Sequence, residues 1–90
     1  MKNLYSVKDL DSDGFGPLFP ETNDAVAIRN LKRTVNSPGN NISEFPDRHV
    51  LFCLGSFDTV KGKLKSEKEP RELVNASFLL DEKPEEENGN

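Results

Sequence analysis

The sequence predicts an α+β domain in which one helix packs on a mostly antiparallel sheet of three to four strands. Three observations indicate this fold class. Apolar and polar residues alternate over residues 3–8, apolar residues recur at helical spacing between residues 24 and 36, and a dense apolar run follows at residues 49–57. One helix between strands that are otherwise joined by short links is typical of an α+β domain.

The N-terminal part should form two strands joined by a turn. Residues 3–8 form the first strand, and Asp9–Gly14 have the composition of a turn. Phe15–Phe19 return as a short second strand or an extended segment, which Pro17 and Pro20 confine to an edge of the sheet.

The helix should begin at Thr22-Asn23-Asp24, because these short polar side chains accept hydrogen bonds from the free amides of a first turn. It should run to about Asn36 and end decisively at Ser37-Pro38-Gly39-Asn40-Asn41. Its apolar stripe consists of Ala27, Ile28, Leu31 and Val35, with Ala25 at the margin.

The C-terminal half contains the strongest strand. Residues 42–48 should be a loop around a proline, residues 49–57 a strand and residues 58–62 a turn. Residues 63–71 fit an extended basic arm or a weak strand. Residues 73–80 are expected to form the last strand, with the inward-facing side chains Val74, Ala76, Phe78 and Leu80.

The strand at residues 49–57 is apolar on both faces. Strand alternation puts Val50, Phe52 and Leu54 on one face, and Leu51, Cys53 and Phe57 on the other. A single helix covers only one face, so the second face needs a loop, a partner protein or a second copy of the chain. We expect a homodimer through this second face.

Charge divides the chain into a neutral body and an acidic tail. The net charge is −4, and residues 81–90 hold five acids and one base, so they carry the whole excess. We expect a single domain over residues 1–80 and a disordered tail over residues 81–90. The longest apolar run has five residues, which predicts no membrane span.

Asp9, Asp11, Asp13 and Gly14 match the first half of a calcium-binding loop. The position that requires a bidentate glutamate holds Pro20 instead, and a strand rather than a helix precedes the loop. A solvated turn is therefore the better interpretation, and no metal or other cofactor is expected.

The sequence contains no recognisable catalytic motif. The single histidine, His49, and the single cysteine, Cys53, are four residues apart on one strand. In a regular strand that separation is about 13 Å, which is too far for a nucleophile and its base. We expect a protein that is not an enzyme.

The basic residues form two groups, and phosphates attract such groups. One lies on the flank of the helix, and the other alternates in the segment after residue 60. Phe57 and Tyr5 would stack bases if they were exposed. The alternative is structural: basic residues favour the negative end of a helix, and lysines on edge strands prevent aggregation. The predicted nucleic-acid contacts are Arg29, Lys32, Arg33, Lys61, Lys63 and Lys65, converging into one patch.

Five segments carry a family resemblance: "NLYSVKD", "FGPLF", "NDAVAIRNLKRTVN", "SEFPD" and "LFCLGSFD". Their order resembles the small nonstructural protein of gokushoviruses, which are single-stranded DNA bacteriophages of the microvirus group. The resemblance covers residues 3–62. After the Phe-Asp pair this chain has Thr59-Val60-Lys61-Gly62, where the family usually has two acids and Thr-Gly.

The resemblance implies a non-virion accessory protein in the cytoplasm of the infected bacterium, acting in single-stranded DNA synthesis or packaging. With the charge pattern, it favours binding of single-stranded DNA. The alternative is a protein–protein adaptor that binds a host replication or defence factor or another phage protein, and the doubly apolar strand at residues 49–57 motivates it.

Overall fold

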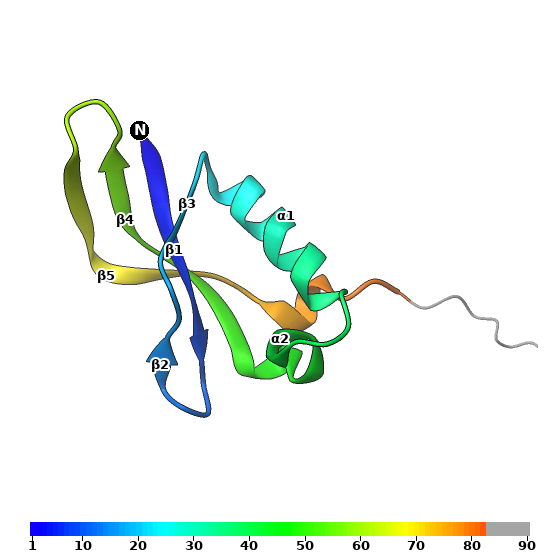
Figure 1. Cartoon of the computed structure of the whole chain (residues 1–90). Helices are drawn as coiled ribbons and strands as arrows, with labels where there is room; N and C mark the ends of the chain where they lie inside the picture. The colour runs from blue at the N-terminus through cyan, green and yellow to red at the C-terminus, as the bar shows by residue number, and fades with distance from the viewer. Residues whose placement is uncertain (83–90) are drawn as a thin grey trace, which may run out of the picture.

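The computed structural model describes residues 1–82 and confirms the α+β class (Figure 1). One main helix packs on a curled antiparallel sheet. The strands are β1 (Lys2–Asp9), β2 (Gly14–Phe15), β3 (Phe19–Glu21), β4 (His49–Asp58) and β5 (Lys63–Asn75). The α-helices are α1 (Asp24–Val35) and α2 (Asn41–Glu44), and 3-10 turns cover Pro46–Arg48 and Ala76–Leu79.

The strand order is β2-β1-β4-β5, and β3 pairs with β1 on the same side as β2. All of these pairings are antiparallel. β1 and β4 therefore form the centre of the sheet, and β5 forms an edge. The charged residues and the proline of β5 suit an edge position, because they discourage pairing with another chain.

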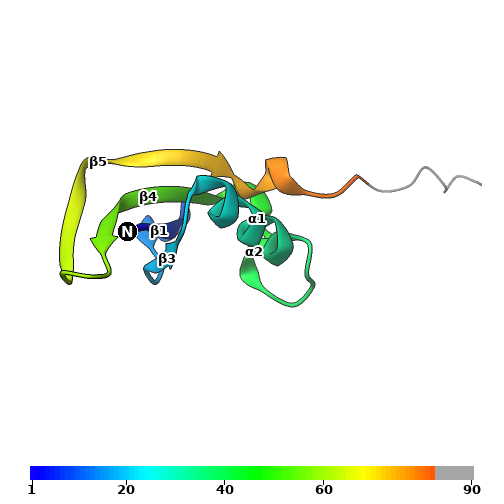
Figure 2. The same cartoon turned by 90° about the horizontal axis from the view of Figure 1, so that it is seen from above.

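The β4–β5 hairpin bends sharply in its middle. Cys53 pairs with Arg71, but Gly55 pairs with Ser66, so four residues of β5 bulge out opposite Leu54. At Gly55 the two strands are so close that an added Cβ would lie 2.3 Å from the carbonyl oxygen of Lys65. Figure 2 shows β5 turning through this bend. We call residues 54–66, beyond the bend, the hairpin arm.

The main core lies between α1 and one face of the sheet. Asn23 caps α1 by accepting a hydrogen bond of 3.0 Å from the amide of Val26. The predicted helix and its apolar stripe are confirmed, with Ile28 partly buried at its margin. The core comprises Tyr5, Ala27, Leu31, Val35, Leu51, Cys53 and Ala76.

Two parts of the chain itself partly cover the second face. The ring of Phe15 packs edge-on against Phe52, with 5.3 Å between centroids. Near the bend, the arm brings Leu64 to a small hollow that it shares with Leu4 and Leu54. Much apolar surface stays open, since Leu64 is 72% exposed.

The predicted division of strand 49–57 was wrong at Phe57. The bulge at Leu54 shifts the alternation by one residue, and Phe57 pairs with Leu64, which faces the second-face hollow. Phe57 therefore lies on the same face as Phe52, and not with Cys53.

The predicted last strand, residues 73–80, was right for residues 73–75, which belong to β5, and wrong for residues 76–80. β5 ends at Asn75, whose side chain accepts a hydrogen bond of 2.9 Å from the amide of Ser77 and starts a 3-10 turn. Ala76 is buried as expected, but Phe78 is 82% exposed and Leu80 is exposed as well. The segment at residues 63–71, left open between an arm and a weak strand, belongs to β5.

A loop was expected at residues 42–48, but this segment contains most of α2 and a 3-10 turn. Asn40 is the N-cap of α2 and forms a capping box with Ser43. Of the predicted tail, Asp81 and Glu82 are described, and residues 83–90 lie outside the described residues. Among residues 1–82, no helix is both long and apolar enough to cross a membrane.

Candidate nucleic-acid interface

Of the helical cations, Lys32 and Arg33 lie in the last turn of α1, where they interact favourably with the negative end of the helix dipole. Arg29 lies about one turn earlier. All three line a hollow of about 400 Å³ with Asn36, Ser37 and Asp81. Lys32 Nζ is 3.8 Å from Oδ1 of Asp81.

The lysines of the hairpin arm lie at the other end of the molecule. In Figure 1 the tip of the β4–β5 hairpin is at the upper left, and the end of α1 is at the lower right. α1 points away from the arm, because Asp24 at its start contacts Arg71 and Asn36 at its end contacts Leu79. The prediction that both groups converge into one patch was therefore wrong.

The tip of the hairpin is a tight, internally bonded turn. The carboxylate of Asp58 accepts hydrogen bonds from the amides of Val60, at 2.9 Å, and Lys61, at 3.1 Å. These amide donors, Lys61 first, lower the pKa of Asp58. The amide of Gly62, at a φ of 70°, donates to the carbonyl oxygen of Asp58 at 2.8 Å. The turn thus holds Lys61 on a defined backbone.

Lys63 and Lys65 follow the turn on one face of β5. They pair with Asp58 and Ser56, and alternate residues of a strand point to the same side, about 6.6 Å apart. Both side chains are exposed. Within residues 1–82, none of the three arm lysines has a carboxylate partner within salt-bridge distance.

The N-terminus adds to the positive charge of the tip. Lys2 pairs with Phe57 at the start of β1, and the terminal ammonium is close enough to contribute to the lowered pKa of Asp58. The arm lysines, Lys2 and the amino terminus therefore form a cationic end of the molecule. We call this set the tip cluster.

The aromatic residues proposed for base stacking contribute little here. Tyr5 is fully buried and its hydroxyl is engaged, so it cannot stack on a base. Phe57 is half-buried on the second face. The exposed apolar residues at the tip are Met1, Val60 and Leu64, which have no aromatic face.

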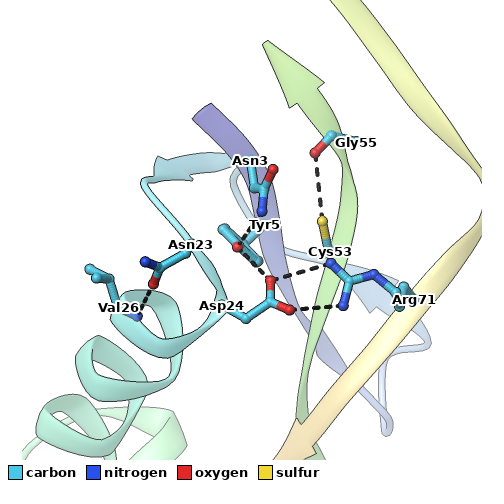
Figure 3. A network of polar contacts seen from close by, with 8 residues as sticks. All are labelled: Asn3, Tyr5, Asn23, Asp24, Val26, Cys53, Gly55 and Arg71. Carbon is cyan, nitrogen blue, oxygen red and sulfur yellow. Dashed lines mark hydrogen bonds and ion pairs between the residues drawn. The ribbon is translucent and has the colours of Figure 1, made fainter. Parts of the chain in front are cut away.

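A polar network, drawn in Figure 3, anchors the base of the arm. Asp24 accepts hydrogen bonds from the Tyr5 hydroxyl, at 2.7 Å, and from the guanidinium of Arg71, at 2.9 and 3.2 Å. The Arg71 bonds, followed by the Tyr5 bond, lower the pKa of Asp24. Burial, with the Asp24 bond, raises the pKa of Tyr5 to about 12. Sequence reasoning missed this network, because the pattern gives no signal that pairs Asp24 with Arg71.

The aspartates of the calcium-like turn have partners within the protein. Asp9 accepts a hydrogen bond of 2.9 Å from the amide of Asp11, which is the main cause of its lowered pKa. Asp11 pairs with Arg48 at 3.0 Å, and Asp13 pairs with Lys8 at 3.2 Å. The carboxylates therefore shape a turn between β1 and β2.

His49 and Cys53 lie in the interior of the molecule. His49 is buried, with Nδ1 2.9 Å from the carbonyl oxygen of Phe45. Cys53 is buried, and its Sγ lies 3.6 Å from the carbonyl oxygen of Gly55.

Comparison with known proteins assigns the chain to a protein family. A family model described as "Phage ORF5 protein" matches residues 2–79, which include every strand and helix described above. No curated protein and no solved structure matches the chain. Because the model matches well over half of the sequence, the chain belongs to the Phage ORF5 protein family.

Proposed function

We propose that this phage accessory protein binds single-stranded DNA through the tip cluster during genome synthesis and packaging. The setting would be the cytoplasm of the infected bacterium, and the source a gokushovirus, as the segments at residues 3–62 suggest. The protein would act without catalysis and without a cofactor. Its membership of a phage family supports the general setting.

The observation that carries this proposal is the distribution of unpaired cations. Lys8, Lys32, Arg48 and Arg71 each have a carboxylate within 4 Å, whereas the arm lysines, like Arg29 and Arg33 of α1, have none among residues 1–82. The arm therefore offers three charges without internal neutralisation, two on one face of β5 and one in the turn before it. A nucleic-acid backbone is a flexible row of single negative charges, which suits such an array.

The test is a fluorescence anisotropy titration of a labelled single-stranded oligonucleotide at several salt concentrations. If the five groups of the tip cluster engage phosphates, the log–log salt slope should be about −3.5, since each contact to a single strand contributes about −0.7. Replacing Lys61, Lys63 and Lys65 with alanine should reduce it to about −1.4.

The matched control replaces Arg29, Lys32 and Arg33 with alanine, which removes the same charge at the other end of the molecule. This variant should keep most of the affinity and the steep slope. A salt-independent titration, or equal losses in both triple variants, would contradict the assignment to the tip cluster.

The open second face favours a different function, a protein–protein adaptor. Phe15, Leu18 and Leu64 are large apolar residues exposed on or beside this face. A second copy of the chain would also cover it and give the expected homodimer, which sedimentation equilibrium of the wild type and Leu64→Glu would reveal. A pull-down from infected cells that survives nuclease and high salt would instead favour a phage or host protein partner.

A further inference from the structure

The hollow beside the end of α1 is lined by cations that lack full neutralisation. Lys32 has one contact, to Asp81 at 3.8 Å. Within residues 1–82, Arg29 and Arg33 have no carboxylate partner, and Arg33 reaches only Oδ1 of Asn30 at 3.4 Å. The hollow has a volume of about 400 Å³. It is thus an open, positively charged depression.

Asn36 fixes the C-terminal segment beside this hollow. Its Nδ2 donates a hydrogen bond of 3.0 Å to the carbonyl oxygen of Leu79, and its Oδ1 accepts one of 2.9 Å from the amide of Asp81. These two hydrogen bonds hold the backbone of residues 79–81 beside the hollow. The chain continues from there into its most acidic stretch, which includes Glu82, Glu85, Glu86 and Glu87.

We propose that this hollow is a docking site for an acidic peptide and that its occupant is the chain's own segment, residues 82–87. Charge complementarity supports this occupant, since four glutamates follow directly on a residue that already pairs with Lys32. Asp81 is the first carboxylate of the series and the only one besides Glu82 that the structure describes.

The reach of the segment is sufficient. Six residues beyond Asp81 span at most about 20 Å when extended. Arg29 lies three residues before Lys32, which is about 4.5 Å along the axis of a helix. The carbonyl end of α1 disfavours carboxylates, so the attraction comes from the basic side chains that project over it.

This docking divides the cations between two ligands. The helical group binds the acidic segment of its own chain, and the tip cluster stays free at the other end of the molecule. A polyanion that reaches Arg29 and Arg33 has to displace the segment first. The proposal concerns the helical group alone and does not depend on whether the tip cluster binds DNA.

The test compares the full chain with a variant in which Glu82, Glu85, Glu86 and Glu87 are glutamine, using ¹⁵N-edited NMR spectra. The resonances of Arg29 and Arg33, including their side-chain Nε–H groups, should differ between the two proteins at 0.1 M salt. The difference should disappear at 1 M salt, because the Debye length falls from about 10 Å to about 3 Å. Resonances of Lys61–Lys65 should not differ.

A peptide with the sequence of residues 82–90, added to the glutamine variant, should shift the same arginine resonances. Replacing Arg29, Lys32 and Arg33 with alanine should abolish these shifts, and replacing Lys61, Lys63 and Lys65 should not. Identical arginine resonances in the full chain and the glutamine variant, or peptide-induced shifts on the arm, would overturn the proposal.

Discussion

The Tyr5 hydroxyl donates a hydrogen bond of 2.7 Å to Oδ1 of Asp24, the first residue of α1. The same carboxylate binds the guanidinium of Arg71, where β5 resumes its pairing with β4 after the bend. One side chain thus joins β1, α1 and β5. The hairpin arm projects from this junction, so the orientation of the arm depends on it.

Tyr5 should titrate far above the ordinary range of tyrosine. Burial and the bond to Asp24 raise its pKa to about 12. The neutral form is favoured in the folded state, so this contribution to stability is complete below about pH 10 and is lost as the pH rises through the folded-state pKa. Tyr5 is the single tyrosine and tryptophan is absent, so absorbance at alkaline pH reports this group alone. A midpoint near that of free tyrosine in the folded protein would contradict the network.

Asp24→Asn should reduce the free energy of unfolding by about 1 kcal/mol, a value discounted because the carboxylate is partly exposed. The pKa of Asp24 is lowered in the folded state, so its contribution is present above the unfolded pKa and is lost as the pH falls through the folded value. Urea unfolding between neutral pH and about pH 3 should therefore show a smaller acid-induced loss in the variant than in the wild type.

Asp47→Asn is the control for this experiment. Among the described residues its carboxylate makes no hydrogen bond or salt bridge, and only its carbonyl oxygen is used, by Asn75. It should change the free energy of unfolding less than Asp24→Asn does, because it removes no hydrogen bond of a side chain. Equal effects of the two substitutions would show that general charge, and not the junction, governs acid stability.

Gly55→Ala should destabilise the protein, because the new Cβ would lie 2.3 Å from the carbonyl oxygen of Lys65. The atom in the way belongs to the backbone, so β4 and β5 must separate, at a cost of about 1–3 kcal/mol. Gly14→Ala is the matched change, since its nearest neighbour is Ser12 Oγ at 3.8 Å, an ordinary contact. Thermal unfolding of both variants measures the difference, and a tolerated Gly55→Ala would argue against the close approach of the two strands in the arm.

The sequence predicted the secondary structure correctly where local residue patterns determine it. The cap at Asn23 and the apolar stripe through Leu31 predicted α1, and the apolar run predicted β4. Patterns failed where non-local geometry decides. The bulge at Leu54 moved Phe57 to the other face, and alternation alone does not reveal a bulge.

In the candidate site, too, the local arrangement of the lysines was predicted, but the distance between the two groups of cations was not. Alternation placed Lys63 and Lys65 on one side of a strand, which the structure bears out. The distance between the arm and the end of α1 depends on the direction of the helix across the sheet. The contact between Asp24 and Arg71 is one of the long-range contacts that go with this direction, and no spacing in the sequence encodes it.

Phe15→Ala and Phe78→Ala should differ in cost, although the two changes are chemically identical. Phe15 is 42% exposed and packs edge-on against Phe52, so its loss should reduce the free energy of unfolding by about 1–2 kcal/mol. Phe78 is 82% exposed on a 3-10 turn and should cost less than about 0.5 kcal/mol. Urea unfolding of the two variants tests this directly. If Phe78→Ala were the more damaging change, Phe78 would face the core as in an uninterrupted strand at residues 73–80, and the turn that follows Asn75 would be wrong.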